Sequence, residues 1–148
     1  MKEFKINIPE EHYQVIEFKQ EDLPGIGVVN TALKDFEPKE VFAWHCSMMI
    51  NFEELIQNGM PSQGDRDIVD KFQDFLDEEI KGDPQKPNAL FLARVTWNKT
   101  REIIWRIHNP EITNGFLTAL IESEDYPREF DFRIDHDPKW KMTEWHLK

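Results

Sequence analysis

The chain has 148 residues, a length that fits one domain with a sizeable core. Its 29 acidic and 18 basic residues give a formal net charge of -11, which opposes the long-range attraction to phosphate backbones on which non-specific nucleic-acid binding depends. We therefore predict no direct binding of DNA or RNA. The hydrophobic share of 39% is too high for a disordered chain, so we expect a soluble globular protein.

Cysteine usage and hydropathy bear on the location of the protein. Cys46 is the only cysteine, so no disulfide can form within the chain, and the class of secreted disulfide-rich domains is excluded. The first residues contain no apolar run of signal-peptide length, and nowhere do eighteen apolar residues occur together. We expect a cytoplasmic location and no membrane association.

The first forty residues contain two candidate strands, residues 13–19 and residues 26–33. Leu23-Pro24-Gly25 lies between them and is typical of a turn. The two strands could extend a sheet formed by the rest of the chain, or they could cover the open face of that sheet. The sequence leaves both placements open.

Residues 42–50 form the next predicted strand, because every second residue is apolar, which is the period of a half-buried strand. Residues 59–62 break this pattern. From Ile68 to Ile80 apolar residues recur at helical spacing, and Gly82 supplies a stop signal. We predict an amphipathic helix here.

The second half of the chain begins with a loop at residues 83–88, which contains two prolines. A β-hairpin follows, with strands at residues 89–97 and 102–108 around a turn at 98–100. Asn109 and Pro110 are typical of a helix N-cap and first turn, and an apolar stripe after them predicts a second helix. Residues 129–135 form the last predicted strand.

From residue 42 onward the predicted order is strand, helix, strand, strand, helix, strand, which is the βαββαβ plan of ferredoxin-like folds. Right-handed crossovers place both helices on one face of the antiparallel sheet. We predict an α+β fold in a single domain, residues 1–148, with an N-terminal β extension (1–40) and a ferredoxin-like core (41–148). One core between the sheet and the helices should contain Trp44, Val95, Trp105, Phe132, Phe72, Leu76, Phe116 and Leu120.

Three short motifs carry a family resemblance: Gly59-Met60-Pro61 before the first helix, Ala93-Arg94-Val95-Thr96 leading into the hairpin, and Asp137-Pro138-Lys139-Trp140 after the last strand. Together they resemble the bacterial family known as domain of unknown function 695. The chain departs from the family pattern in two places. The hairpin turn at 98–100 lacks the glycine expected in the family, and Thr143 stands where a tyrosine often follows the tryptophan in the family.

The resemblance implies a ferredoxin-like plan shared with the regulator of ribonuclease activity B, a small acidic protein that binds and inhibits ribonuclease E. It therefore implies a non-catalytic regulatory role. It supplies no catalytic residue, because the family has no established active site.

A possible ligand site lies on the strand faces opposite the large apolar residues. In a sheet with helices on one side only, several polar side chains there would lie within reach of one another, and guanidinium groups bind carboxylates in bidentate fashion. The alternative is a solvated face with cross-strand ion pairs, for example between Arg133 and a neighbouring carboxylate. The candidate ligand-binding residues are His45, Arg94, Arg106, His108 and Arg133, and Asp135 shares their face.

Other candidate sites are weaker. The run Asp135-His136-Asp137 contains metal-ligand types, but adjacent strand residues point to opposite faces, so we predict no metal site and expect Trp140 to fold back over a sheet edge or a helix end. Cys46 sits in the apolar alternation of its strand and is expected in the core rather than as a nucleophile. No glycine-rich phosphate loop or other cofactor motif occurs, so we predict no cofactor.

The leading functional interpretation is a non-catalytic module that binds another protein and regulates it. The alternative is a small-molecule enzyme or sensor that binds an anion or carboxylate on the Arg/His face. A deep pocket enclosing His45, Arg106 and His108 would favour the alternative, whereas a filled face with an exposed apolar patch would favour a partner surface. The oligomeric state does not follow from the sequence.

Overall fold

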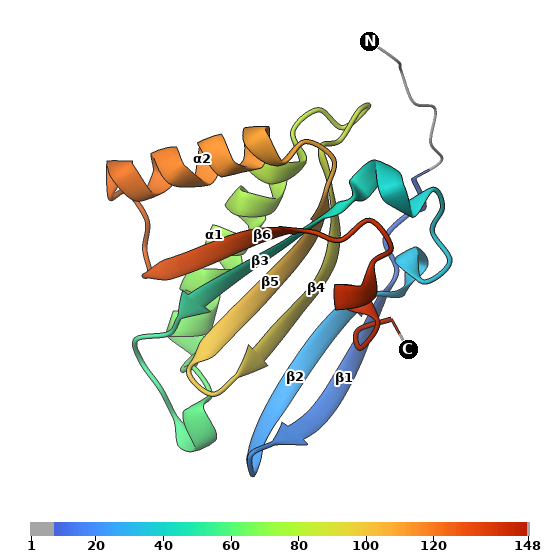
Figure 1. Ribbon diagram of the computed structural model, residues 1–148. Helices are drawn as coiled ribbons and strands as arrows, with labels where there is room; N and C mark the ends of the chain where they lie inside the picture. Colours follow the sequence, from blue (N-terminus) through green and yellow to red (C-terminus); the bar gives the residue numbers. More distant parts are fainter. Residues whose placement is uncertain (1–7, 148) are drawn as a thin grey trace.

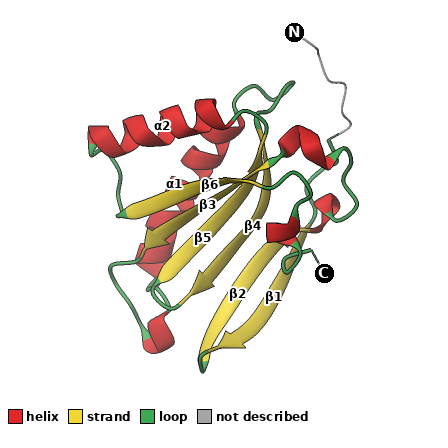
Figure 2. Cartoon of the chain, in the orientation of Figure 1, coloured by secondary structure: helices red, strands yellow, loops and turns green. Residues whose placement is uncertain are grey.

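The protein is built on one open sheet of six antiparallel strands with two α-helices, as the computed structural model of residues 8–147 shows (Figures 1 and 2). The strands are β1 (Tyr13–Gln20), β2 (Leu23–Asn30), β3 (Trp44–Asn51), β4 (Ala89–Trp97), β5 (Thr100–Ile107) and β6 (Phe130–His136). The helices are α1 (Gln63–Lys81) and α2 (Pro110–Ser123). The predicted α+β class and antiparallel sheet are therefore confirmed.

The strand order is β1-β2-β4-β5-β3-β6, and every neighbouring pair is antiparallel. Helix α1 connects β3 to β4, and β5 lies between these two strands. Helix α2 connects β5 to β6, and β3 lies between them. The N-terminal hairpin β1-β2 extends the sheet by pairing with β4, so the first of its two possible placements is the one adopted.

Local capping signals set the ends of both helices. The Ser62 hydroxyl accepts a hydrogen bond from the Asp65 backbone N–H at 3.1 Å, so α1 begins before the apolar stripe does. Gly82 ends α1 with a φ of 70°, a conformation that suits glycine. Asn109 caps α2 as expected, because its side chain accepts from the Glu111 backbone N–H at 3.0 Å.

The core between the sheet and the helices contains most of the residues expected there. Phe72, Leu76 and Trp105 are buried in it. Four further expected members are partly buried and pack against it, namely Trp44, Phe116, Leu120 and Phe132. Val95 lies outside this cluster, because the β4–β5 register shifts between Phe91 and Ala93 and reverses the faces of the strand beyond the bulge.

The opposite face of the sheet is covered as well. A second core cluster there consists of Val29, Leu33, Phe36, Phe42, Leu90, Leu92, Ala93, Ile104 and Trp140. The segment between β2 and β3 and the segment after β6 supply the cover, and Figure 1 shows the C-terminal turn on the side of the sheet away from α1. Trp140 therefore packs over the sheet itself, against Phe36, rather than over an edge or a helix end.

Candidate functional site

The sheet face that carries Arg106 is filled by the chain itself. Arg106 is fully buried and forms an ion pair with Asp137, with Nη1 3.0 Å from Oδ2. It also donates to the Phe42 carbonyl at 3.3 Å, and its guanidinium carbon lies 4.8 Å from the centre of the Trp140 ring. Arg106 thus fixes the C-terminal segment to the sheet.

His45 belongs to the same cluster. It is 4% exposed, and its Nδ1 lies 3.3 Å from Nη1 of Arg106. Burial and the charge of Arg106 lower the pKa of His45 to about 4, so the imidazole is neutral at pH 7. The structure brings His45 and Arg106 together, but in packing rather than around an open pocket.

The other three candidates lie apart from this pair. His108 is exposed, and its Nδ1 lies 2.7 Å from the Val41 carbonyl oxygen. Arg133 is exposed on β6 and forms an ion pair with Asp135 at 2.9 Å, which is the kind of carboxylate partner expected for it. Arg94 faces α1, so the expectation that it shares a face with Arg106 is wrong, and the β4 bulge is the reason.

The weaker candidates also have structural roles. Asp137 pairs with Arg106, and the His136 ring lies 4.7 Å from the Trp44 ring. Within residues 8–147, no group of three or more His, Cys, Asp and Glu side chains is arranged to hold a metal ion. Cys46 is fully buried, and burial raises the pKa of its thiol to about 12, which keeps it protonated at pH 7.

The surface is hollowed between α1 and the part of the sheet that β1 and β2 extend, and the row of hollows continues past α1 onto the β1-β2 hairpin. Four adjoining hollows lie in a row, and each shares lining residues with the next: Glu11 joins the first two, Val28 and Arg94 join the second and third, and Ile26 and Met60 join the third and fourth. We call this row the α1 groove. Strand β2 lines it from Asn30 to Pro24, a length of about 20 Å at about 3.3 Å per residue.

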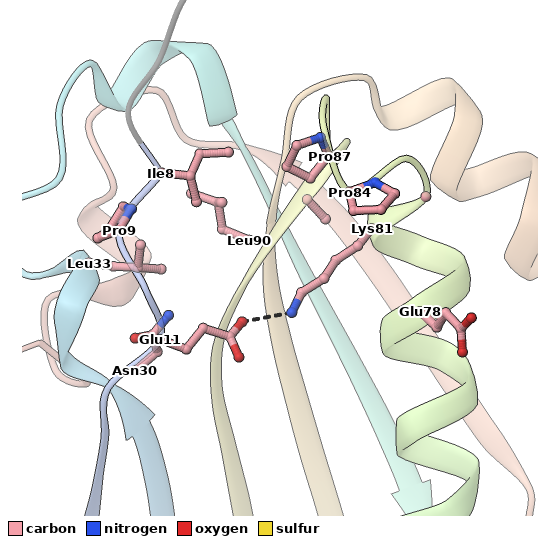
Figure 3. A pocket seen from close by; sticks show the side chains of 12 residues that line it. Ile8, Pro9, Glu11, Asn30, Leu33, Glu78, Lys81, Pro84, Pro87 and Leu90 are labelled. Carbon is pink, nitrogen blue, oxygen red and sulfur yellow. Dashed lines mark hydrogen bonds and ion pairs between the residues drawn. The ribbon is translucent and has the colours of Figure 1, made fainter.

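The first hollow is apolar and has a volume of about 320 Å³. Figure 3 shows Lys81 reaching from α1 toward Glu11, with its Nζ 2.7 Å from Oε2. Burial alone lowers the pKa of Lys81, but the contacts with Glu11 and Asp77 outweigh burial and raise it, so the ammonium group stays charged and paired. The apolar lining consists of Ile8, Pro9, Leu33, Pro84, Pro87, Ala89 and Leu90.

The second hollow, of about 240 Å³, mixes both charges, with Asp74, Asp77 and Arg94 in its lining. Tyr13 lies beside them and donates a short hydrogen bond to Glu11. Burial, followed by the contact with Glu11, raises the pKa of Tyr13, so its hydroxyl is a neutral donor at pH 7.

The third hollow contains three arginines, Arg66 from α1, Arg94 from β4 and Arg101 from β5, and we call it the arginine hollow. Its volume is about 130 Å³. One carboxylate, that of Asp70, pairs with both Arg94, at 3.7 Å, and Arg101. Arg66 makes no side-chain ion pair with any residue that the structure describes.

Arg101 is the fixed member of this set. It is 3% exposed, donates from Nε to the Thr96 hydroxyl at 3.2 Å, and lies 5.7 Å from the centre of the Phe52 ring. Burial lowers the pKa of Arg101, and the charges of Arg94 and Arg66 lower it further. The charges of Arg94 and Arg66 therefore both act on Arg101, while its hydrogen bond to Asp70 opposes them.

The sequence interpretation missed Arg66 and Arg101 as site residues. Arg66 lies before the apolar stripe of α1, where no pattern marked it. A signal existed for Arg101, because a hairpin around residues 98–100 places it diagonally across from Arg94, and the structure pairs it with Thr96. Arg66 comes from α1 and not from the hairpin, so no local sequence pattern could place it beside Arg94 and Arg101.

Comparison with known proteins extends the resemblance seen in the three motifs. No helix among residues 8–147 is long and apolar enough to cross a membrane. No curated protein and no solved structure matches the chain. The model of a family of unknown function, DUF695, matches residues 12–145, which is nearly the whole chain. The chain therefore belongs to the DUF695 family.

Proposed function

We propose that this protein is a non-catalytic binding module that holds an extended segment of a partner protein in the α1 groove. The observation that carries the proposal is the row of adjoining hollows, in which each hollow shares at least one lining residue with the next and residues of β2 line all four. A groove of about 20 Å along one strand accommodates an extended segment of about six residues.

The chemistry of two hollows, the first and the third of the row, defines the partner segment. The apolar hollow at the Asn30 end favours a hydrophobic side chain, and the arginine hollow favours a negatively charged one. Tyr13, which lines the second hollow, and Val15 of β1 are 53% and 64% exposed, which adds apolar area at the sheet edge. The preferred segment is therefore extended, with an apolar side chain for the first hollow and an acidic group for the third.

We also propose that β3 to β6 with their helices form a ferredoxin-like unit to which β1 and β2 are added. The arrangement in which a third strand separates the two parallel strands of each βαβ unit supports this assignment. A regulatory role in the cytoplasm is the proposal that the resemblance to the regulator of ribonuclease activity B and the acidic composition support.

The alternative of an enzyme or sensor built on His45 and Arg106 has less support. Both side chains are buried under the C-terminal segment, and Arg106 is engaged by Asp137 and the Phe42 carbonyl. A ligand at that face would have to displace Trp140.

Selection from a displayed library of random heptapeptides tests the proposal. We expect the wild-type protein to enrich peptides that carry an acidic residue and an apolar residue. Val28→Phe fills the floor shared by two hollows and should abolish this enrichment, because the ring occupies the path of the peptide. The matched control is Ile112→Phe on the exposed face of α2, where Ile112 is 59% exposed, and it should leave the enrichment intact.

Two outcomes would reject the proposal. One is the absence of enriched peptides with the folded wild-type protein. The other is equal enrichment by the Val28→Phe and wild-type proteins, which would place peptide binding elsewhere on the surface. Circular dichroism and thermal melting of each variant establish that the fold is retained.

A further inference from the structure

We propose that the arginine hollow is a carboxylate-binding site, in which Arg66, Arg94 and Arg101 receive an acidic side chain or a C-terminal carboxylate of the bound segment. The proposal rests on the proposed function only for the source of the carboxylate. The site itself depends on the geometry of the three arginines, so binding of small carboxylates tests it separately from peptide binding.

The arginine hollow carries an excess of positive charge. Three guanidinium groups line a hollow of about 130 Å³, and the carboxylate of Asp70 pairs with two of them, Arg94 and Arg101. The whole chain has a net charge of -11, so this cluster opposes the general charge of the molecule. A hollow with charge of one sign and walls of low polarity concentrates the field and attracts a counter-ion.

Two of the arginines have hydrogen-bond donors to offer a ligand. Arg94 makes no hydrogen bond to Asp70, since its Nη1 lies 3.7 Å from the nearest carboxylate oxygen. The side chain of Arg66 has no hydrogen-bond partner among residues 8–147. Two guanidinium groups, one of them from the first turns of a helix and one from a strand, can therefore turn toward a bound anion and donate to both of its oxygens.

One arginine of the hollow is already held in place. Arg101 is held by Thr96, Asp70 and the Phe52 ring, so one positive charge is fixed at the base of the hollow at no further cost in side-chain freedom. Arg94 is about one-third exposed and Arg66 is exposed, so these two can adjust to the ligand. A bound anion would therefore meet the fixed charge of Arg101 and the adjustable charges of Arg94 and Arg66.

The lining selects a carboxylate over a phosphate. Ile26, Val28, Met60 and Pro61 form apolar walls that suit the methylene groups of an acidic side chain. Asp70 remains within the cluster, and it repels a dianion more strongly than a monoanion. A singly charged carboxylate therefore matches both the charge and the walls.

Titrations followed by NMR test the site. N-acetyl-glutamate amide serves as the probe for a side-chain carboxylate, N-acetyl-alanine as the probe for a C-terminal carboxylate, and inorganic phosphate as the competing anion. We expect one or both carboxylates to give saturable shifts at the backbone amides of Thr96 and Arg101. The probe with the higher affinity identifies which source the site prefers.

Two double variants isolate the arginines. Arg66→Gln/Arg94→Gln should weaken carboxylate binding at least about tenfold, because each charged hydrogen bond accounts for a factor of about ten or more. The matched control, Arg133→Gln/Lys139→Gln, removes the same charge from exposed positions away from the groove and should change the affinity less than twofold. Arg101 is left intact, because its removal would leave Asp70 without its buried partner.

The proposal is overturned if neither carboxylate binds, if phosphate binds more tightly than both, or if the two double variants lose affinity equally. Failure of the proposed function has a different signature. Carboxylate binding that depends on Arg66 and Arg94, together with an empty peptide selection, would reject the peptide groove and retain the anion site.

Discussion

The guanidinium carbon of Arg106 lies 4.8 Å from the centre of the Trp140 ring, and this contact joins β5 to the segment that follows β6. The Trp140 indole N–H donates to the carbonyls of Lys39 at 2.9 Å and Phe42 at 3.0 Å, so the segment before β3 is held by the same side chain. Three parts of the chain that are distant in sequence thus meet at one residue pair.

Trp140→Ala should lower the free energy of unfolding by about 3–5 kcal/mol, because it removes a ring that is only 2% exposed from the second core. Trp145→Ala is the control, since Trp145 is 49% exposed, and it should cost about 1 kcal/mol or less. Urea unfolding of both variants measures the difference. Equal losses would mean that Trp140 does not hold the C-terminal segment.

Asp137→Asn should be strongly destabilising, by about 3–5 kcal/mol, because it leaves the buried guanidinium of Arg106 without its counter-charge. Asp135→Asn breaks the ion pair with Arg133, whose side chain is 71% exposed, and should have little effect. Thermal and urea unfolding provide the comparison. A mild effect of Asp137→Asn would show that the carbonyl contacts of Arg106 are sufficient.

His45 should make stability fall as the pH falls from about 6.5 to about 4. Burial and Arg106 lower the pKa of His45 to about 4 in the folded protein, so on acidification the unfolded chain takes up the proton first. The contribution of neutral His45 to the free energy of unfolding is therefore complete only above the pKa of the unfolded chain. The loss across this window is about 3 kcal/mol at about 1.4 kcal/mol per pKa unit. Urea unfolding at several pH values checks it.

His45→Gln should remove this part of the pH dependence. The remaining loss in acid comes from groups such as Asp137. Burial alone raises the pKa of Asp137, but hydrogen bonds from the Met142 N–H, Arg106 and the Lys141 N–H outweigh burial and lower it, so its contribution is lost as the pH falls through the folded pKa. An unchanged slope in the His45→Gln protein between pH 6.5 and 4 would contradict the assignment.

Gly25→Ala should destabilise the N-terminal hairpin by about 1–3 kcal/mol, because a Cβ at this position would lie 2.2 Å from Cζ of Phe18. The Phe18 ring also makes an edge-on contact with the Trp145 ring at 5.7 Å, which limits its retreat. Phe18→Leu should partly rescue the alanine variant. A raised melting temperature in Gly25→Ala alone would show that the ring moves freely.

Sequence periodicity placed most of the elements because its causes are local. The alternation in residues 42–50 predicts β3, and Cys46, Met48 and Ile50 are fully buried on the face that alternation assigned to the core. Asn109 and Pro110 predict the start of α2 at the correct residue, since a cap depends only on its own turn.

No local sequence signal predicts the bulge in β4. One extra residue between Phe91 and Ala93 moves Arg94 and Val95 to the faces opposite those that strict alternation assigns. Arg94 therefore lies in the α1 groove and not on the face that carries His45 and Arg106. An inserted residue of this kind becomes visible only when the partner strand is known.

The open face of the predicted sheet was also filled by a contact that pattern could not reveal. The motif around Trp140 indicated a specific ending for the chain, but the choice of surface for the indole depended on Arg106 and Phe36 from distant segments. Hydrophobic periodicity, helix caps and turns depend on residues that are close together in the sequence, so the sequence alone determines them. The α1 groove and its arginines come from β2, α1, β4 and β5, and they exist only because pairing of the six strands brings these elements side by side.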